Sequence, residues 1–393
     1  MNSVVMALGD RVASALLGVD ALYLQSLQRA TIDTPCDDGL LAAEGLVAVN
    51  LSTAIPTAYE SWEAAALDWL DIQRQAEGLG NQSRRAYYED LAASILAIIS
   101  WREQGRAHPQ GESFELLGQR MLGLERLAFT EKEWEGANDS LSQSLRNAGY
   151  RGKSLGESLN SWEVSTRVPE NDVILVLTEL LSASRAWVEA RMFALPATRT
   201  MRAVGVRDVA YSAYCDFVGG EMQINLDQPY TLGELRHLVA HEAYPGHATH
   251  LAIREEAAAS GASPADALLV VTDTPTSTVF EGIGDNGMRF CWTADPDDAL
   301  VMNVFRMRIL AACRAAIRLA AGEDQDAVSR ILAEESHGVP AWVNQRMRFL
   351  SLPLRRPFIF AYAWGERVVA DVYRNIAPQD RQRFFDALYK HHH

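Results

Sequence analysis

The run of residues from His241 to His247, which reads H-E-A-Y-P-G-H, is the feature that most constrains this chain. Four of the nine histidines lie between His237 and His250. Neutral imidazole offers a nitrogen lone pair to a metal ion, and a His-Glu pair followed by a second His on a helix is the arrangement of zinc hydrolases. In zinc hydrolases the imidazoles hold the metal, and the glutamate acts on the water molecule that the metal binds. The run therefore predicts a metal centre that the rest of the chain supports.

The two histidines at the ends of this run stand six residues apart, a spacing that a regular helix does not bring together. A helix turns by about 100° per residue, so His241 and His247 would point well away from each other. Proline removes a backbone donor and clashes with the preceding turn, while glycine permits unusual backbone angles. We therefore expect the helix to break at Pro245 and Gly246. The break would turn His247 toward His241, and the helix would resume through Glu256.

The start of this helix is marked by Thr231 and Glu234, which form the S/T-x-x-E pattern of a capping box. His237 follows one turn before His241, so an H-x-x-x-H pairing of these two residues is an alternative pair of ligands. We rank it lower because it leaves Glu242 and the proline–glycine break without a role.

A third ligand is expected from the segment F-E-G-I-G-D, in which Glu281 follows Pro275 and a Thr/Ser-rich turn where a helix would start. Asp285 lies one turn later, placed to accept an N–H from a metal-bound imidazole and fix its tautomer. The glycines of this segment favour either close packing against the metal helix or a loop. His250, one turn beyond His247, is a reserve ligand or a group that orients one.

The remainder of the chain predicts a mainly α fold with a small sheet beside the metal helix. Residues 1–196 show apolar positions at helical spacing and are expected to form a helical N-terminal half that walls a cleft. Residues 197–390 form the metal-binding half, and the two halves are expected to make one integrated domain. Helices are also expected at about 297–321, 324–336, 340–351 and 357–375. Residues 391–393 are interpreted as the remnant of an expression tag.

One strand is predicted from residues 221–226, where polar and apolar side chains alternate after a Gly-Gly turn. Such a strand on the rim of a cleft can pair its main-chain groups with an extended substrate. A packing hairpin without a role in binding is the equally open alternative.

Charge and cysteine content limit the partners of the protein. The net charge of −15 argues against a nucleic acid or an anionic membrane surface, each of which requires a basic face. The four cysteines, Cys36, Cys215, Cys291 and Cys313, include no C-x-x-C pair and favour free thiols in a reducing compartment. Residues 1–24 lack a basic leader and are interpreted as a helix, and no apolar run spans a bilayer. We therefore expect a cytoplasmic protein with a peptide or small-molecule substrate.

The motif His-Glu-x-x-Pro-Gly-His, followed 35 to 40 residues later by Glu281-Gly282, resembles a bacterial family of zinc peptidases described mostly as a domain of unknown function. Members of that family carry H-E-x-x-P-G-H-H and then E-G-W. The spacing of Glu281 and Asp285 is also similar to that of the gluzincin peptidases. Residues 220–225 match the strand that precedes the family motif, and residues 362–365 resemble its Y-x-x-G stretch. The likeness covers roughly residues 200–375.

The resemblance implies His241, His247 and Glu281 as ligands of one zinc ion, and Glu242 as the general base. It also implies a zincin-like, mostly helical fold around a deep cleft. Another divalent transition metal in place of zinc stays open. Two positions beside the metal depart from the pattern, because Ala248 replaces the second His and Ile283 stands where Trp is usual. These departures bear on the choice of substrate.

Three functions follow from these residues. The first is a zinc-dependent hydrolase of amide or peptide bonds, in which Glu242 takes a proton from water and passes it to the leaving nitrogen. Tyr362 is the second catalytic candidate, since a phenol near the metal steadies a developing oxyanion; the alternative is an ordinary half-buried tyrosine. The second function is a metal-dependent lyase, isomerase or non-peptide hydrolase acting on a small metabolite in a biosynthetic pathway. The third is a non-catalytic helical binding protein with structural histidines.

Overall fold

Helices make up most of the computed structural model, which describes residues 3–30, 45–104, 112–291 and 296–390. The prediction of a mainly α protein is confirmed. Cys36 and the tag residues 391–393 lie outside the described residues. Among the described helices, none combines the length and the apolar character needed to cross a membrane.

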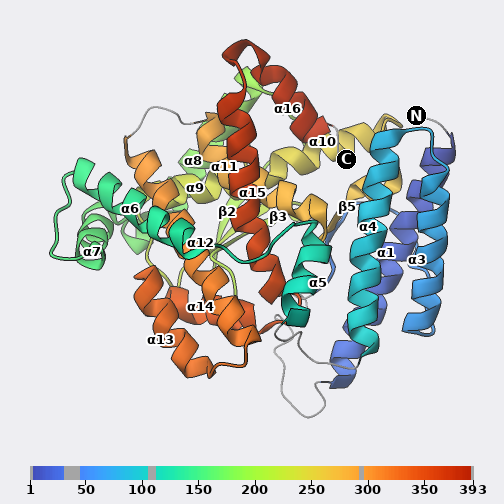
Figure 1. Cartoon of the computed structure of the whole chain (residues 1–393). Helices are drawn as coiled ribbons and strands as arrows, with labels where there is room; N and C mark the ends of the chain where they lie inside the picture. The colour runs from blue at the N-terminus through green and yellow to red at the C-terminus, as the bar shows by residue number, and fades with distance from the viewer. Residues whose placement is uncertain (1–2, 31–44, 105–111, 292–295, 391–393) are drawn as a thin grey trace.

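The N-terminal half begins with a group of antiparallel helices: α1 (Ser3–Ala30), α3 (Trp62–Glu77), α4 (Gln82–Glu103) and α5 (Glu112–Leu122). Figure 1 shows α1, α3 and α4 side by side at one end of the molecule. Ser61 and Asn81 cap α3 and α4 by accepting bonds from backbone N–H groups three residues on, and Trp69 and Ile72 are buried between the helices. These helices bury apolar faces against one another and form one side of the core.

A two-stranded sheet that the sequence did not predict ties this helical group to the second half. Strand β1 (Val47–Asn50) pairs antiparallel with β5 (Leu269–Val271). The largest apolar cluster contains residues from both ends of the chain, from Val5 to Ala363. Residues from both predicted halves, 1–196 and 197–390, therefore contribute to this one apolar core.

Next along the chain come α6 (Glu131–Asn147), α7 (Leu155–Thr166) and α8 (Val173–Arg191), followed by a three-stranded sheet. Its strands are β2 (Arg202–Val206), β3 (Ala213–Asp216) and β4 (Glu221–Asn225), in the order β2-β4-β3. Strand β4 is parallel to β2 and antiparallel to β3. The strand predicted from alternation is β4, which is central, so the outer strand that contacts α9 is β3.

The second half supplies the helices that build the centre of the molecule: α9 (Leu232–Glu242), α10 (His247–Ala259), α11 (Pro275–Cys291), α12 (Pro296–Ala320), α13 (Gln325–Ser336), α14 (Pro340–Ser351), α15 (Arg355–Asn375) and α16 (Arg381–Lys390). The four late helices predicted from the sequence, α12 to α15, begin and end within two residues of the expected bounds. Helix α11 packs between α9 and α15, and α15 runs through the middle of the view in Figure 1.

Candidate metal centre

The break between α9 and α10 is the local feature on which the centre depends. Helix α9 ends at Glu242, residues 243–246 form a turn, and α10 begins at His247. The Tyr244–Pro245 peptide bond is cis. A Cβ atom at Gly246 would lie 1.8 Å from the backbone oxygen of His241, so only glycine fits there. The predicted break at the proline and glycine is confirmed.

The break brings the rings of His241 and His247 together in an edge-to-face arrangement. Their ring centroids are 4.6 Å apart and the rings are inclined by 80°. Ligand atoms from His241, Glu242 and His247 all lie within 4.8 Å of one another, and all three residues are buried. Two imidazoles spaced six residues apart therefore share one small volume with a carboxylate.

Glu281 on α11 completes this group. Its Oε2 atom lies 3.3 Å from His241 Nε2 and 3.7 Å from His247 Nε2. Ligands held tetrahedrally at about 2.1 Å from a zinc ion are separated by about 3.4 Å, so these two distances are close to the separation of ligands in a zinc site. Glu281 Oε2 is buried and accepts no hydrogen bond from the described part of the chain. The donor set fits a divalent transition metal, because a buried carboxylate oxygen without a hydrogen bond is costly unless a cation satisfies it.

Asp285, one turn after Glu281, orients His241 as the sequence predicted. Its Oδ1 atom lies 3.0 Å from His241 Nδ1, which leaves Nε2 directed at Glu281. Burial alone would raise the pKa of Asp285, but hydrogen bonds with His237 and His241 lower it to about 2. A Cβ atom at Gly284 would lie 2.7 Å from the His241 ring, so α11 touches α9 there. The glycines of this segment therefore mark close helix packing and not a loop.

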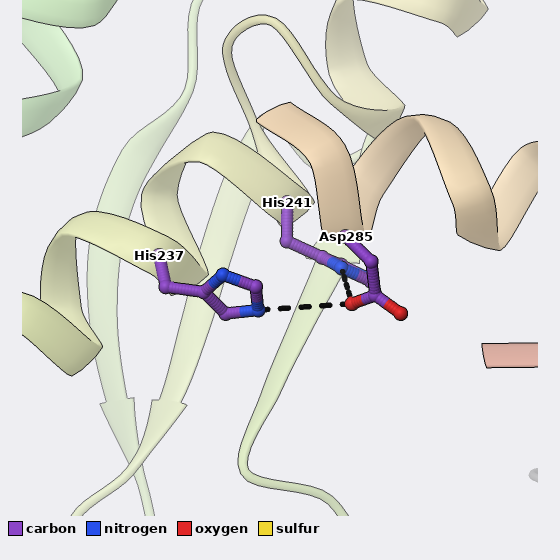
Figure 2. Close-up of side chains that lie close together, drawn as sticks. All are labelled: His237, His241 and Asp285. Carbon is purple, nitrogen blue, oxygen red and sulfur yellow. Dashed lines mark hydrogen bonds and ion pairs between the residues drawn. The ribbon is translucent and has the colours of Figure 1, made fainter. Parts of the chain in front are cut away.

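His237 belongs to a second group of metal-ligating side chains, with His241 and Asp285 (Figure 2). His237 Nε2 lies 3.6 Å from Asp285 Oδ1, and its ring stacks on Phe305 with centroids 3.8 Å apart. In this group Asp285 already has hydrogen-bonding partners, whereas Glu281 Oε2 has none among the described residues. The carboxylate of the second group, Asp285, is therefore satisfied without an ion, whereas Glu281 Oε2 is not.

Glu242 stands beside the ligand atoms in a buried position suited to a base. Burial raises the pKa of its carboxyl group above the ordinary value. A base whose pKa approaches the working pH accepts and returns a proton efficiently. The structure therefore places the Glu242 carboxylate beside His241 and His247, and its role as a base stays a prediction.

A cavity of about 450 Å³ reaches the centre at His241, Glu242 and Asp285. Residues around the start of β3, including Tyr211 and Ala213, line another part of its wall. Strand β3 of the sheet therefore borders the cavity.

Tyr362 on α15 also lines this cavity, with its ring centroid 6.3 Å from that of His241. Burial raises the pKa of its phenol well above the ordinary value, as do the nearby carboxylates of Glu281 and Glu242. The phenol is therefore protonated and can donate a hydrogen bond.

The structure places His250 behind His247, against the rings of Phe280 and Tyr389 at centroid distances of 5.4 and 5.7 Å. Phe280 itself stacks on the His247 ring at 4.0 Å, an interaction that the sequence analysis missed.

Comparisons with known proteins identify no family for this chain. No family model matches it, and no curated protein is significantly similar to it. A solved structure described as "the putative lipoprotein from Colwellia psychrerythraea" is similar, with a TM-score of 0.55 and 13% identity over 83% of this chain and 63% of that one. A second, described as a lipoprotein of unknown function from Shewanella oneidensis, has 14% identity, a TM-score of 0.49, and coverages of 82% and 67%. This chain spans 63% of the length of the first of these proteins, and the likeness concerns the fold.

Two expectations from the sequence are wrong by these comparisons. The resemblance to a zinc peptidase family, with the descriptions metallopeptidase and gluzincin-like, is contradicted because no family model matches and the structural neighbour from Colwellia psychrerythraea is described as a "putative lipoprotein". A motif of seven residues is enough to break a helix and to place a set of donor atoms. Unrelated chains can carry the same motif for that reason, so it does not identify a family.

The expectation of a cytoplasmic protein is contradicted by the structural neighbour from Colwellia psychrerythraea, which is described as a "putative lipoprotein". Cysteine content and net charge gave the wrong answer because they report the cellular compartment only indirectly.

Proposed function

We propose that this chain is a zinc-dependent hydrolase of amide bonds, in which His241, His247 and Glu281 hold one zinc ion. The observation that carries the proposal is the convergence of two imidazole nitrogens on Glu281 Oε2, at 3.3 and 3.7 Å, beside the carboxylate of Glu242. A zincin-like arrangement, with helices and the edge of β3 around a deep cleft, is part of the same proposal. It is supported by the cavity that reaches His241 and Glu242 between β3 and α15.

Each residue of the centre has a distinct role in this reaction. Zinc, when bound, polarises a substrate carbonyl and lowers the pKa of water to about 7. Glu242 accepts a proton from the attacking water and delivers it to the leaving nitrogen as the carbon–nitrogen bond breaks. Tyr362 donates a hydrogen bond to the oxyanion that develops on the former carbonyl oxygen. Asp285 holds the His241 ring in the tautomer that leaves Nε2 free.

A second candidate is a metal-dependent lyase, isomerase or other hydrolase that acts on a small metabolite. The size of the cavity favours this reading, since about 450 Å³ lies within the range of about 300–1,000 Å³ typical of small-molecule sites. Both candidates use the same ligands and differ in the bond that is broken.

The decisive experiment combines elemental analysis with the variant Glu242→Gln. We expect one zinc ion per chain in the wild-type protein and in this variant, because Glu242 is not one of the three ligands. Turnover of a library of amides and small peptides is expected in the wild-type protein and should be abolished in the variant. A library that is left intact by fully zinc-loaded wild-type protein would favour the second candidate. Wild-type activity in Glu242→Gln would remove the proposed base.

The matched control is Glu255→Gln. Glu255 lies on α10 outside the centre, and its carboxylate pairs with Arg199. It is expected to keep both zinc and turnover. Absence of stoichiometric metal in the wild-type protein would contradict both candidates and favour a binding protein with structural histidines.

A further inference from the structure

The cavity beside the metal centre is lined by several arginines, and most of them are neutralised by neighbouring carboxylates. Arg308 pairs with Glu234 at 3.0 Å and also with Glu163, and Arg306 pairs with Glu366 at 2.6 Å. Nearer the solvent, Arg367 pairs with Glu133, Arg374 pairs with Asp371 at 2.7 Å, and Arg167 is exposed. These pairs leave little net charge on the wall that they share.

Arg346 on α14 differs from these arginines. It lines the cavity and is half-buried, yet no hydrogen bond or ion pair joins its guanidinium to another residue in the described part of the chain. Its Nε atom is completely buried. Burial lowers the pKa of the Arg346 guanidinium below its ordinary value. A buried cation without an anionic partner makes the folded state less stable. Arg346 is therefore better explained by a role in binding than by a role in stability.

The guanidinium of Arg346 is fixed by its surroundings. It lies 5.4 Å from the ring centroid of Trp342 and 5.4 Å from that of Phe349, and both rings also line the cavity. Contacts of this kind hold the plane of the guanidinium and leave its N–H edge available. The adjacent Gln345 fixes the helix, because it accepts a bond from the Ser212 hydroxyl at 3.0 Å and donates one to the Ala210 oxygen at 3.2 Å.

Arg346 also lies close to the proposed centre. The negative charge of Asp285 acts on its guanidinium. Tyr362 and Asp285 line the same cavity, which reaches His241 and Glu242. A substrate bound at the centre would therefore lie within reach of Arg346.

We propose that Arg346 binds a carboxylate group of the substrate, so that the amide hydrolysed at the centre belongs to a molecule with a free acid. This inference rests on the proposed function of the same site. The guanidinium fork matches a carboxylate in a bidentate geometry. One unpaired positive charge neutralises one negative charge, which favours a carboxylate over a doubly charged phosphate. The metal and Glu242 act on the amide, and Arg346 determines which amides bind.

The test measures binding without turnover, in zinc-loaded protein that carries Glu242→Gln. The probes are the N-acetyl derivatives of the twenty amino acids, each as the free acid and as the carboxamide, with dissociation constants measured by calorimetry. We expect one or more free acids to bind, and their carboxamides to bind about 10- to 100-fold more weakly. Adding Arg346→Gln should reduce the affinity for the acid to that for the carboxamide.

The matched control is Arg348→Gln, on the same helix, which removes a guanidinium that pairs with the exposed Asp208 at 3.0 Å. It should keep the preference for the acid. If Arg346→Gln fails to fold, Arg346→Lys replaces it and should keep a weakened preference, because it retains the charge and loses the fork.

Two results would overturn the assignment: free acids and carboxamides that bind equally to the Glu242→Gln protein, or an acid preference that survives in Arg346→Gln. Failure of the proposed function is a separate result. If acids bind through Arg346 but the wild-type protein hydrolyses no amide, the carboxylate site stands and the hydrolase is wrong. If amides are hydrolysed without any preference for an acid, the reverse holds.

Discussion

Two buried carboxylate clusters of this protein are built in opposite ways. In the first, Asp266 lies between α4 and α10, and both of its oxygens accept hydrogen bonds, from Arg84 at 3.0 Å and from the Tyr88 hydroxyl at 3.2 Å. In the second, Glu281 is also buried, but its Oε2 atom faces two imidazole nitrogens and accepts no hydrogen bond from a described residue. A carboxylate in a satisfied cluster contributes to stability, and one left unsatisfied requires an explanation, which the proposed zinc ion would provide.

The largest effect is expected from a substitution that breaks the first cluster. Asp266→Ala leaves Arg84 buried at 1% exposure without a counter-charge, so we expect the free energy of unfolding to fall by about 3–5 kcal/mol. Urea denaturation monitored by circular dichroism measures the change. Zinc content should stay at the wild-type level. The double variant Arg84→Met/Asp266→Ala should recover part of the loss, because no unpaired charge remains.

The next largest effect is expected from a substitution that breaks the second cluster. Glu281→Gln removes the only carboxylate among the three proposed ligands, and we expect zinc affinity to fall at least about 100-fold, since even partners of ligands change it by about 10–100-fold. Stability of the metal-free protein should stay the same or increase, because a neutral group replaces a buried charge. Competition with a chromophoric chelator gives the affinity.

His237→Gln is the control for Glu281→Gln, because it tests the second group of ligand atoms. It should leave zinc affinity close to that of the wild-type protein. Retention of zinc in Glu281→Gln together with its loss in His237→Gln would move the ion to His237, His241 and Asp285.

A smaller effect is expected from the residue that orients His241. Asp285→Asn removes the negative charge beside Nδ1 and should weaken zinc binding by about 10–100-fold, which is less than the effect of Glu281→Gln. The same chelator competition measures it. A loss greater than that of Glu281→Gln would make Asp285 a ligand.

The smallest effect concerns pH. Burial alone would lower the pKa of His241, but the carboxylates of Asp285 and Glu281 beside its ring raise it well above the ordinary value. The metal-free centre therefore holds a proton that zinc must displace, so zinc affinity should fall about tenfold for each unit of decreasing pH below that pKa. Chelator competition at pH 6, 7 and 8 measures the slope. Asp285→Asn should give a shallower slope, and a slope unaffected by this variant would contradict the role of Asp285.

The two clusters also differ in how far the sequence could predict them. The proposed ligands, the base and the helix break were available from the sequence, because Pro245, Gly246 and the His-Glu pair act on their immediate neighbours. The partnership of Arg84 with Asp266 was not, since 182 residues separate them and neither lies in a recognisable pattern. The same reason explains why the pairing of β1 with β5 was missed, although β4 was found from its alternation.

Arg346 shows why a list of charged residues does not identify a site. In the sequence it is one arginine among many on amphipathic helices, and its neighbours in the chain give no sign of its role. Only the tertiary structure pairs Arg306 and Arg308 with carboxylates and leaves Arg346 between two aromatic rings. The family and the compartment were misjudged for a related reason, because a short motif and a composition report local chemistry.

The sequence by itself determined the local conformation of the chain: where the late helices begin and end, where α9 is capped by Thr231, and where the backbone must break before His247. These features depend on interactions between residues a few positions apart, so a single sequence is sufficient to predict them. The tertiary structure decided which atoms meet, including Glu281 Oε2 with the two imidazoles and Arg346 with the cavity. Those contacts join segments far apart in the chain, and packing of the whole core sets their distances.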